Sequence, residues 1–191
     1  EYEQQLNELN ERMSSLRQDL TAAREEMKRD SLTDAYNRGA FDAAIAQSLN
    51  MHFILQQPVT LVMVDLDNFK EVNDNYGHAA GDEALRAVGD CLARSFIRKS
   101  DFVARYGGDE FAVILTDTSA RHAAKLIDRF LDYARSIRVS AAPDEALVAC
   151  SAGYTEIVSI DTVEDLIQRA DRALYQAKAE GRNRAAFLGA E

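Results

Sequence analysis

Residues 59–67 read VTLVMVDLD, a continuous apolar and β-branched run that ends at Asp65 and Asp67. A run of this length and composition predicts a strand over residues 59–64 that is buried on both faces. Carboxylates that follow such a strand point into the usual ligand crevice of a helix-covered sheet. Two hard oxygen ligands there suit Mg²⁺ or Mn²⁺, although acidic residues also close many strands simply as turn formers.

Helical and strand-like segments alternate on both sides of this run. Alternation of this kind predicts an α/β or α+β sheet that is covered by helices. The helical periodicity predicts helices over residues 40–55, 80–96, 119–137 and 163–180, and the last of these ends before Gly181 as a C-cap. The strand pattern predicts strands over residues 102–106, 111–115, 138–140 and 146–155.

The first thirty residues form a separate segment without Pro or Gly. Their apolar residues recur at spacings that alternate between three and four, and this is the seam of a coiled coil about 30 Å long. We predict a parallel homodimer through residues 1–29, the alternative being a lone amphipathic helix packed on its own domain. The seam consists of Leu6, Leu9, Met13, Leu16, Leu20, Ala23 and Met27.

The chain of 191 residues carries 22 basic and 32 acidic residues, for a formal net charge of −10. This balance argues against binding to a nucleic-acid backbone or to an anionic membrane surface, so we expect no nucleic-acid partner. It leaves room for a nucleotide carried by a divalent cation, because the cation reverses the local sign of charge.

Cys91 and Cys150 lie far apart and match no metal-binding spacing. We expect two reduced core thiols, with a single disulfide as the alternative. No apolar run is long enough to span a bilayer, and no signal peptide is visible. Because the sequence starts at Glu1 rather than Met, we expect a piece of a longer protein, which would reach a membrane only through an upstream region.

Gly107-Gly108-Asp109-Glu110 lies between two predicted strands and reads as a hairpin turn. Glycines allow a sharp turn and let a phosphate approach the backbone amides, but an ordinary hairpin also uses Gly-Gly. If Asp65 and Glu110 lie on neighbouring strands, a cation between them is the economical explanation for the clustered negative charge.

Two further segments carry groups that suit a nucleotide. Residues 68–82 contain a lysine suited to a phosphate, together with amides and carboxylates that can read a guanine edge; the alternative is a solvated loop. Lys178 and Arg182 lie one helical turn apart and could reach phosphates together, or they are simply solvated helix charges.

Arg105-Tyr106-Gly107-Gly108-Asp109-Glu110-Phe111 resembles the signature of GGDEF-domain diguanylate cyclases, which make cyclic di-GMP from two GTP. The resemblance extends over residues 30–38, 65–82, 101–115 and 171–183, in the same order as in the family. It implies an α+β fold with a palm-like, ferredoxin-type sheet related to nucleotidyl cyclases and polymerases. The implied domains are a coiled-coil helix over 1–29 and a cyclase domain over 30–191, in the bacterial cytosol.

The same resemblance implies roles for individual residues. Asp65, the backbone carbonyl of Leu66 and Glu110 would hold Mg²⁺, with Asp109 close to the metal or the ribose. Glu110 is the proposed proton acceptor from the attacking 3′-hydroxyl. A hydroxyl that is bound to the metal ion needs little help from a protein base to lose its proton. The residues implied to bind GTP are Asn73 and Asp82 on guanine, His78 in the same loop, Phe69, Lys70, Lys178 and Arg182 around the triphosphate (Lys70 also stabilising the transition state), and Gly107 and Gly108 in the hairpin.

Arg98 and Asp101 resemble the Arg-x-x-Asp site at which this family binds its own product, with a surface ion pair as the alternative. The implied function is a metal-dependent diguanylate cyclase that acts as a homodimer and is inhibited by cyclic di-GMP. A catalytically idle cyclic di-GMP receptor is the alternative, although the intact hairpin favours the enzyme. The chain departs from the family at Asp34-Ala35, where Gly-Leu is usual, and this affects coupling to the N-terminal helix rather than the chemistry.

Overall fold

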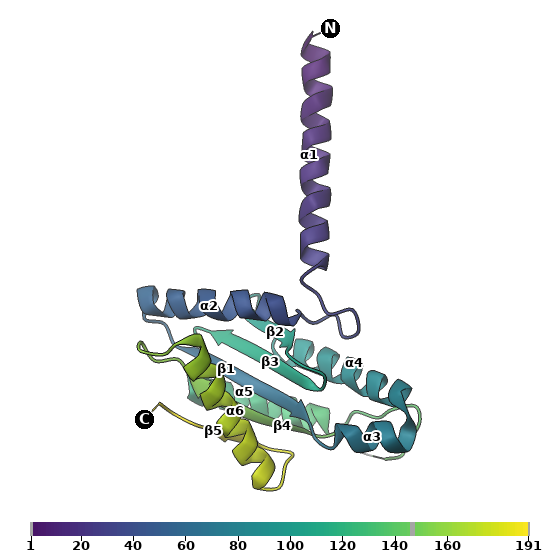
Figure 1. The fold of residues 1–191 in the computed structure, drawn as a ribbon, viewed down its shortest axis with the longest axis vertical. Coiled ribbons are helices and arrows are strands. Elements are labelled where there is room, and N and C mark those ends of the chain that lie inside the picture. Colours follow the sequence, from purple (N-terminus) through teal and green to yellow (C-terminus); the bar gives the residue numbers. More distant parts are fainter. Residues whose placement is uncertain (1, 146–147, 191) are drawn as a thin grey trace.

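A computed structural model of the protein describes residues 2–145 and 148–190. It contains a five-stranded sheet, helices on both faces of that sheet, and a long N-terminal helix (Figure 1). The strands are β1 (Val59–Leu66), β2 (Asp101–Arg105), β3 (Glu110–Thr116), β4 (Cys150–Glu156) and β5 (Ala185–Phe187); the helices are α1 (Tyr2–Glu26), α2 (Arg38–Leu55), α3 (Phe69–Tyr76), α4 (His78–Ser95), α5 (Ala120–Ala134) and α6 (Val163–Ala179).

The sheet has the order β2-β3-β1-β4-β5. The central strand β1 is antiparallel to both of its neighbours, β3 and β4, and β5 is parallel to β4 at one edge. The first four strands, with α3 and α4 in the first crossover and α5 in the second, form the βαββαβ unit of ferredoxin-like folds. This confirms the predicted α+β class and its ferredoxin-type sheet.

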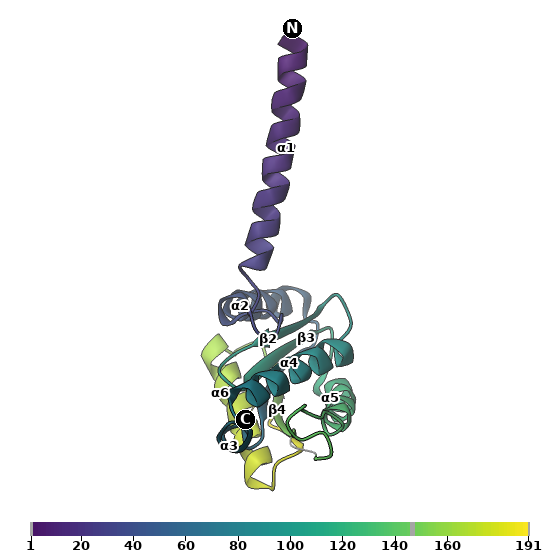
Figure 2. The same ribbon diagram turned by 90° about the vertical axis from the view of Figure 1, so that its right-hand side faces the viewer.

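Alternation along β1 assigns its side chains to the two faces of the sheet. Val62 and Val64 pack in the cluster that includes α4 and α5, whereas Leu61 and Met63 pack in the cluster that includes α2 and α6. Figure 2 shows α6 on one side of the sheet and α4 and α5 on the other. Asp65 follows the parity of Leu61 and Met63, so its side chain lies on the α6 face.

Helix α1 projects away from the sheet and its helices in both views (Figures 1 and 2). It has no buried residue among those described, and seam residues such as Leu9 and Leu16 are 57% and 67% exposed. The alternative of a helix packed on its own domain is therefore wrong. Pairing of α1 with a second chain stays a prediction.

Most predicted elements match the structure to within a few residues, and five differences matter. Strand β1 continues to Leu66, so Asp65 lies inside the strand rather than after it. Helix α3 occupies part of the segment for which a loop was the alternative, β5 was not predicted, and Val139 forms only an isolated bridge. The strand predicted from residue 146 begins at Cys150, and residues 146–147 lie outside the described part.

The two cysteines are free and buried, as predicted. None of the helices in the described ranges, 2–145 and 148–190, is long and apolar enough to cross a membrane.

Candidate active site

Asp65 and Glu110 lie directly opposite each other on neighbouring strands, because β1 and β3 pair in that register. Side chains at directly opposite positions of an antiparallel pair lie about 5 Å apart at their Cβ atoms. The Asp65 side chain is only 9% exposed. The two central strands thus bring together the two carboxylates on which the sequence-based metal site depends.

The environment of Asp65 opposes its negative charge. Burial is the largest cause that raises its pKa to about 6, and the ion pair with Lys178 acts in the opposite direction. The negative charges of Asp109 and Glu110 raise the pKa further. A cation at this position would relieve that repulsion.

Lys178 supplies a positive charge at the same carboxylate. Its Nζ lies 2.9 Å from Oδ1 of Asp65, and it reaches there from the last turn of α6. The structure therefore brings together Asp65, Glu110 and Lys178, which belong to three different predicted motifs.

The donor set fits Mg²⁺. The residues that the structure describes contain no cage of three or more His, Cys, Asp or Glu side chains for a metal ion. Mg²⁺ commonly takes one or two carboxylates and completes its shell with water and substrate phosphates, so a full protein cage is not needed. Asp65, Glu110 and the Leu66 carbonyl are the hard oxygen donors available here.

The hairpin between β2 and β3 is closed by backbone bonds to Glu110. The amides of Tyr106 and Gly107 donate to its carbonyl oxygen at 2.8 and 3.2 Å, and the amide of Leu66 donates to the Asp109 carbonyl at 3.2 Å. A Cβ atom at Gly107 would lie 2.8 Å from Oε2 of Glu110. Glycine at this position thus lets the Glu110 carboxylate lie back against the turn.

Helices α3 and α4 carry the residues predicted to bind guanine and phosphate. Phe69, Lys70 and Asn73 lie on α3, and His78 and Asp82 lie on the first turns of α4. Lys70 and His78 are exposed, whereas Asn73 and Asp82 are partly buried.

Gly81 is a residue of this region that the sequence reasoning missed. A Cβ atom there would lie 2.0 Å from Oδ1 of Asn73 and 3.2 Å from Cε2 of Phe69. The side chains of Asn73 and Phe69 therefore pack against bare backbone next to Asp82. The glycine-rich composition of residues 77–81 was the only signal in the sequence.

Asp67 takes a different position from Asp65. Its carboxylate accepts hydrogen bonds from Ser151 Oγ at 2.7 Å and from the Asn183 amide at 2.9 Å. Asp67 is 5% exposed and fixes the turn that follows α6. Arg182 lies in that turn and is exposed.

Asp171 on α6 is a further carboxylate near the pair of Asp65 and Glu110, and the sequence motifs did not single it out. Partial burial of its carboxyl is the largest cause that raises its pKa, and the charge of Glu110 raises it further, whereas Arg38 and Lys178 lower it. Arg38 in turn lies over the Tyr106 ring, 3.8 Å from the centroid, directly before the hairpin glycines.

Arg105 connects the hairpin to the start of the domain. Its Nη2 donates to the Gly108 carbonyl at 2.7 Å, and its Nη1 lies 3.2 Å from Oδ1 of Asp30. Asp30 also accepts hydrogen bonds from the amide and hydroxyl of Thr33 at 2.9 and 2.8 Å. The segment that joins α1 to the domain is thus bonded through Arg105 to the hairpin between β2 and β3.

Arg98 and Asp101 form an ion pair at the start of β2, at the opposite end of that strand from the hairpin. Arg98 donates to Oδ1 of Asp101 through Nη2 at 2.6 Å and through Nε at 3.0 Å. Its Nη2 also donates to Thr118 Oγ1 at 2.7 Å. The Asp101 side chain is 2% exposed and that of Arg98 is 44% exposed, so the arginine presents the accessible part of the pair.

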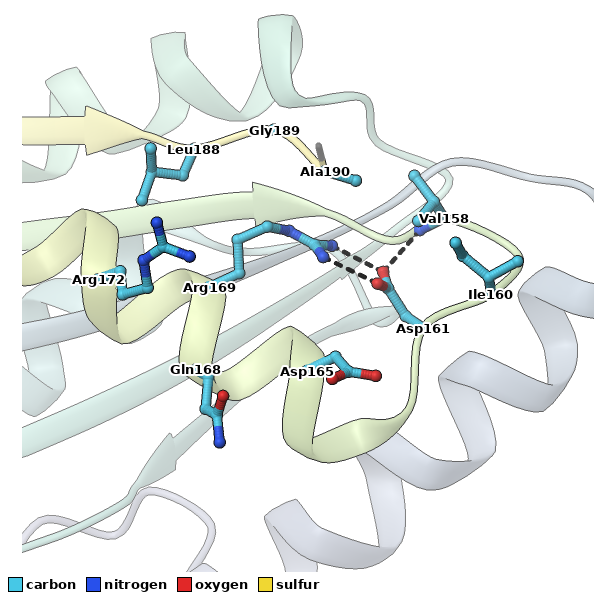
Figure 3. Close-up of a pocket in the computed structure, with 10 residues that line it drawn as sticks. All are labelled: Val158, Ile160, Asp161, Asp165, Gln168, Arg169, Arg172, Leu188, Gly189 and Ala190. Atoms are coloured by element: carbon cyan, nitrogen blue, oxygen red, sulfur yellow. Dashed lines mark hydrogen bonds and ion pairs between the residues drawn. The ribbon is translucent and has the colours of Figure 1, made fainter.

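A surface cavity of about 280 Å³ lies between α6 and the C-terminal segment, away from all of these residues (Figure 3). Its central groups bind one another: Arg169 Nη2 lies 2.6 Å from Oδ2 of Asp161, which also accepts from the Val158 amide at 2.8 Å. The pair stabilises the loop between β4 and α6, and none of the predicted site residues lines this cavity.

A ferredoxin-type sheet with facing carboxylates on its two central strands is typical of palm-like nucleotidyl cyclases and polymerases. The sequence profile of the family described as "Diguanylate cyclase, GGDEF domain" matches residues 27–184. The chain belongs to this GGDEF-domain family.

Several curated proteins are similar over most of the chain. Diguanylate cyclase DgcP of Pseudomonas aeruginosa is 34% identical over 94% of this chain and 28% of its own length. Diguanylate cyclase VdcA of Vibrio cholerae is 37% identical over 94% of this chain and 52% of its own length. Diguanylate cyclase DosC of Escherichia coli is 36% identical over 85% of this chain and 35% of its own length. The chain thus spans about half or less of the length of these relatives.

Two solved structures match nearly the whole chain. The coiled coil and GGDEF domain of DgcB from Caulobacter crescentus, in complex with c-di-GMP, matches with a TM-score of 0.87 and 30% identity, over 97% of this chain and 98% of that one. Diguanylate cyclase SiaD from Pseudomonas aeruginosa, in complex with its activator SiaC, matches with a TM-score of 0.84 and 30% identity, over 97% of this chain and 71% of that one. Matches of this coverage include most of α1.

Proposed function

We propose that this chain is a diguanylate cyclase domain that condenses two GTP into cyclic di-GMP and pyrophosphate. The observation that carries the proposal is the register that sets Asp65 opposite Glu110 beside an intact Gly107-Gly108 turn. Membership of the GGDEF-domain family, and relatives that are named diguanylate cyclases, support it.

Recognition of GTP divides between two parts of the domain. Asn73 and Asp82 read the guanine edge where α3 packs against α4, with His78 beside them, and Phe69 lies next to the triphosphate. Lys70, Lys178 and Arg182 bind the triphosphate, and the hairpin amides of Gly107 and Gly108 lie close to its phosphates.

Asp65, Glu110 and the Leu66 carbonyl hold Mg²⁺ or Mn²⁺ in this proposal. An ion held there would lower the pKa of the attacking 3′-hydroxyl and would neutralise charge on the leaving oxygens. Glu110 accepts the 3′-hydroxyl proton, and Asp109 lies next to the ribose. Lys178 leaves Asp65 and turns its ammonium to the phosphates, and Lys70 stabilises the negative charge of the transition state.

The reaction requires two copies of the chain. Each domain binds one GTP, so two domains must face each other in antiparallel orientation for one 3′-oxygen to reach the other α-phosphorus. The exposed seam of α1 supplies the dimer contact, as a parallel coiled coil over residues 1–29 followed by the cyclase domain over 30–191. An upstream signal then acts by changing the relative orientation of the two domains.

Arg98 and Asp101 form the product-inhibition site. The exposed guanidinium of Arg98 binds a guanine edge or phosphate of cyclic di-GMP, and Asp101 accepts from guanine N–H groups once Arg98 moves aside. The domain acts in the bacterial cytosol, where GTP is available.

The test is incubation with GTP and Mg²⁺ after bound product has been stripped, followed by chromatography of the nucleotides. Cyclic di-GMP and pyrophosphate are the expected products, and chelation of the metal stops their formation. Glu110→Gln abolishes turnover and retains cyclic di-GMP binding, whereas Arg98→Ala retains turnover and loses product binding. Absence of synthesis by both wild type and Arg98→Ala, with tight cyclic di-GMP binding by the wild type, would identify a receptor instead.

A further inference from the structure

The two aspartates at the end of β1 both bond to the C-terminal end of α6 or to the turn after it, but by different means. Asp65 pairs with the side chain of Lys178, whereas Asp67 accepts a hydrogen bond from the backbone amide of Asn183 at 2.9 Å. The bond to Lys178 joins two side chains and can exchange when a ligand arrives. The bond to Asn183 fixes the path of the main chain.

The turn after α6 has an unusual backbone. Gly181, Arg182 and Asn183 all have positive φ, at 114°, 61° and 51°. The left-handed region is unfavourable for most L-residues, Asn being the most tolerant, and two non-glycine residues, Arg182 and Asn183, follow one another there. Such a conformation persists only where the surrounding bonds determine it.

The Arg182 amide donates to the Ala177 carbonyl at 3.1 Å as a helix cap, and at the next residue, Asn183, the inner bonds converge on Asp67. Ser151 Oγ donates to Oδ1 of Asp67 at 2.7 Å and itself accepts from the Asn183 amide at 3.2 Å. Ser151 is fully buried and Asp67 is 5% exposed, so these are hydrogen bonds to a carboxylate shielded from water. On the outer side, Arg135 donates to Oδ1 and to the carbonyl of Asn183 at 2.9 and 3.1 Å.

We propose that Asp67 is a positioning residue that holds Arg182 in the geometry needed to bind the substrate triphosphate. The inference rests on the proposed function, because it takes Arg182 as a phosphate ligand. Both carboxylate oxygens of Asp67 are engaged, Oδ1 by Ser151 and Oδ2 by Asn183. The two aspartates of Val64-Asp65-Leu66-Asp67 thus have different roles. Asp65 binds the metal ion and releases Lys178 when the ligand arrives, and Asp67 holds the turn that presents Arg182 to the phosphates.

A double-mutant cycle tests the connection between Asp67 and Arg182. Binding of 3′-deoxy-GTP with Mg²⁺ is measured by calorimetry, since this nucleotide lacks the attacking oxygen and is not turned over. We expect Asp67→Asn to weaken binding about tenfold in the wild-type background and less than about twofold in the Arg182→Ala background. Ser151→Ala gives the same pattern with a smaller effect, and it serves if Asp67→Asn does not fold.

Asp161→Asn is the matched control. Asp161 is also a carboxylate shielded from water, and it accepts hydrogen bonds from a backbone amide and from a side chain. It stabilises the loop before α6, however, at the opposite end of that helix from Lys178. Its loss lowers the thermal midpoint and leaves the affinity for 3′-deoxy-GTP within about twofold. This separates a general loss of stability from a loss of positioning.

Four outcomes would overturn the inference. Additive effects of Asp67→Asn and Arg182→Ala would mean that Asp67 does not act through Arg182. A shift in the Mg²⁺ concentration for half-saturation as large as that of Asp65→Asn would make Asp67 a metal ligand. No effect of Arg182→Ala on binding would remove Arg182 from the phosphate subsite, while turnover of GTP by the wild type would still support the proposed function. If wild type binds no 3′-deoxy-GTP, both the proposed function and the inference are rejected.

Discussion

At the scale of single residues, the charged form of Asp65 destabilises the folded protein. Its carboxylate is 9% exposed, and the Lys178 ammonium at 2.9 Å does not fully offset burial and the neighbouring negative charges, because the pKa still rises to about 6. Functional sites often contain a residue whose charged form is destabilised by the surrounding folded structure.

Asp65→Asn is therefore expected to stabilise the metal-free protein while it abolishes turnover. The folded-state pKa lies above the unfolded value of 3.8, so the charged form destabilises the fold above about pH 6, and this destabilisation fades as the pH falls towards 4. In EDTA we expect the variant to exceed wild type in free energy of unfolding by roughly 1–3 kcal/mol at pH 8, and by less at pH 5. Urea denaturation at the two pH values measures this difference.

A variant that is less stable than wild type at pH 8 would contradict this account. It would mean that the lost pairing with Lys178 outweighs the relief of burial and of repulsion from Asp109 and Glu110. The lysine, rather than the carboxylates, would then dominate the electrostatics of the site.

At the scale of elements, close backbone approach decides where the site residues lie. Helix α6 contacts β4 at Gly153, where a Cβ atom would lie 2.0 Å from the Leu174 amide nitrogen. This contact sets the height of α6 above the sheet and therefore the reach of Lys178 to Asp65. At Gly81 of α4, in contrast, the close atoms belong to the side chains of Asn73 and Phe69 on α3.

Gly81→Ala is expected to disturb guanine binding with little change in stability. The new Cβ would lie 2.0 Å from Oδ1 of Asn73, the end of a side chain that can rotate, so the fold accommodates it and the guanine contact does not. We expect the KM for GTP to rise about tenfold with the thermal midpoint nearly unchanged. In Gly39→Ala, the matched control in α2, the new Cβ meets only Asn37 Oδ1 at 3.6 Å, and KM stays at the wild-type value. A wild-type KM in Gly81→Ala would remove Asn73 from guanine recognition.

Elements with strong local patterns could be predicted from the sequence, and those that depend on distant contacts could not. The apolar run of β1 and the periodicity of α4 and α6 are local signals, and the structure confirms all three. Helix α3 has only eight residues, most of them polar, and the three-residue β5 exists because β4 lies beside it.

The candidate site shows the same limit at residue level. The family motifs predicted Asp65 and Glu110 as ligands of one metal ion, and the strand register places the two residues opposite each other. The role of Asp67 depends on bonds to Ser151 and Asn183, which lie 84 and 116 residues away along the chain. No local pattern records pairings over such distances, and the same holds for the salt bridge of Arg105 with Asp30, 75 residues apart.

At the scale of the whole molecule, one chain holds one pair of facing carboxylates and extends one apolar seam into solvent. The seam ends at Met27, just before a junction that is bonded, through Asp30 and Arg105, to the carbonyl of Gly108 in the hairpin. If α1 pairs with a second chain, the orientation of that pair is transmitted to both hairpins through a short and rigid path.

Leu9→Glu with Leu16→Glu tests this dependence on pairing. The two charges lie in the seam and repel their counterparts in a parallel dimer, so we expect monomers in sedimentation and a specific activity at nanomolar protein at least about tenfold below wild type. Asn7→Glu with Ser14→Glu adds the same charge on the outer face of α1 and leaves both quantities unchanged. Because each domain of the seam variant still binds GTP, its specific activity should recover as the protein concentration rises, whereas damage to the active site would persist at every concentration. Activity equal to wild type at nanomolar protein, with monomers in sedimentation, would show that the domains meet without α1.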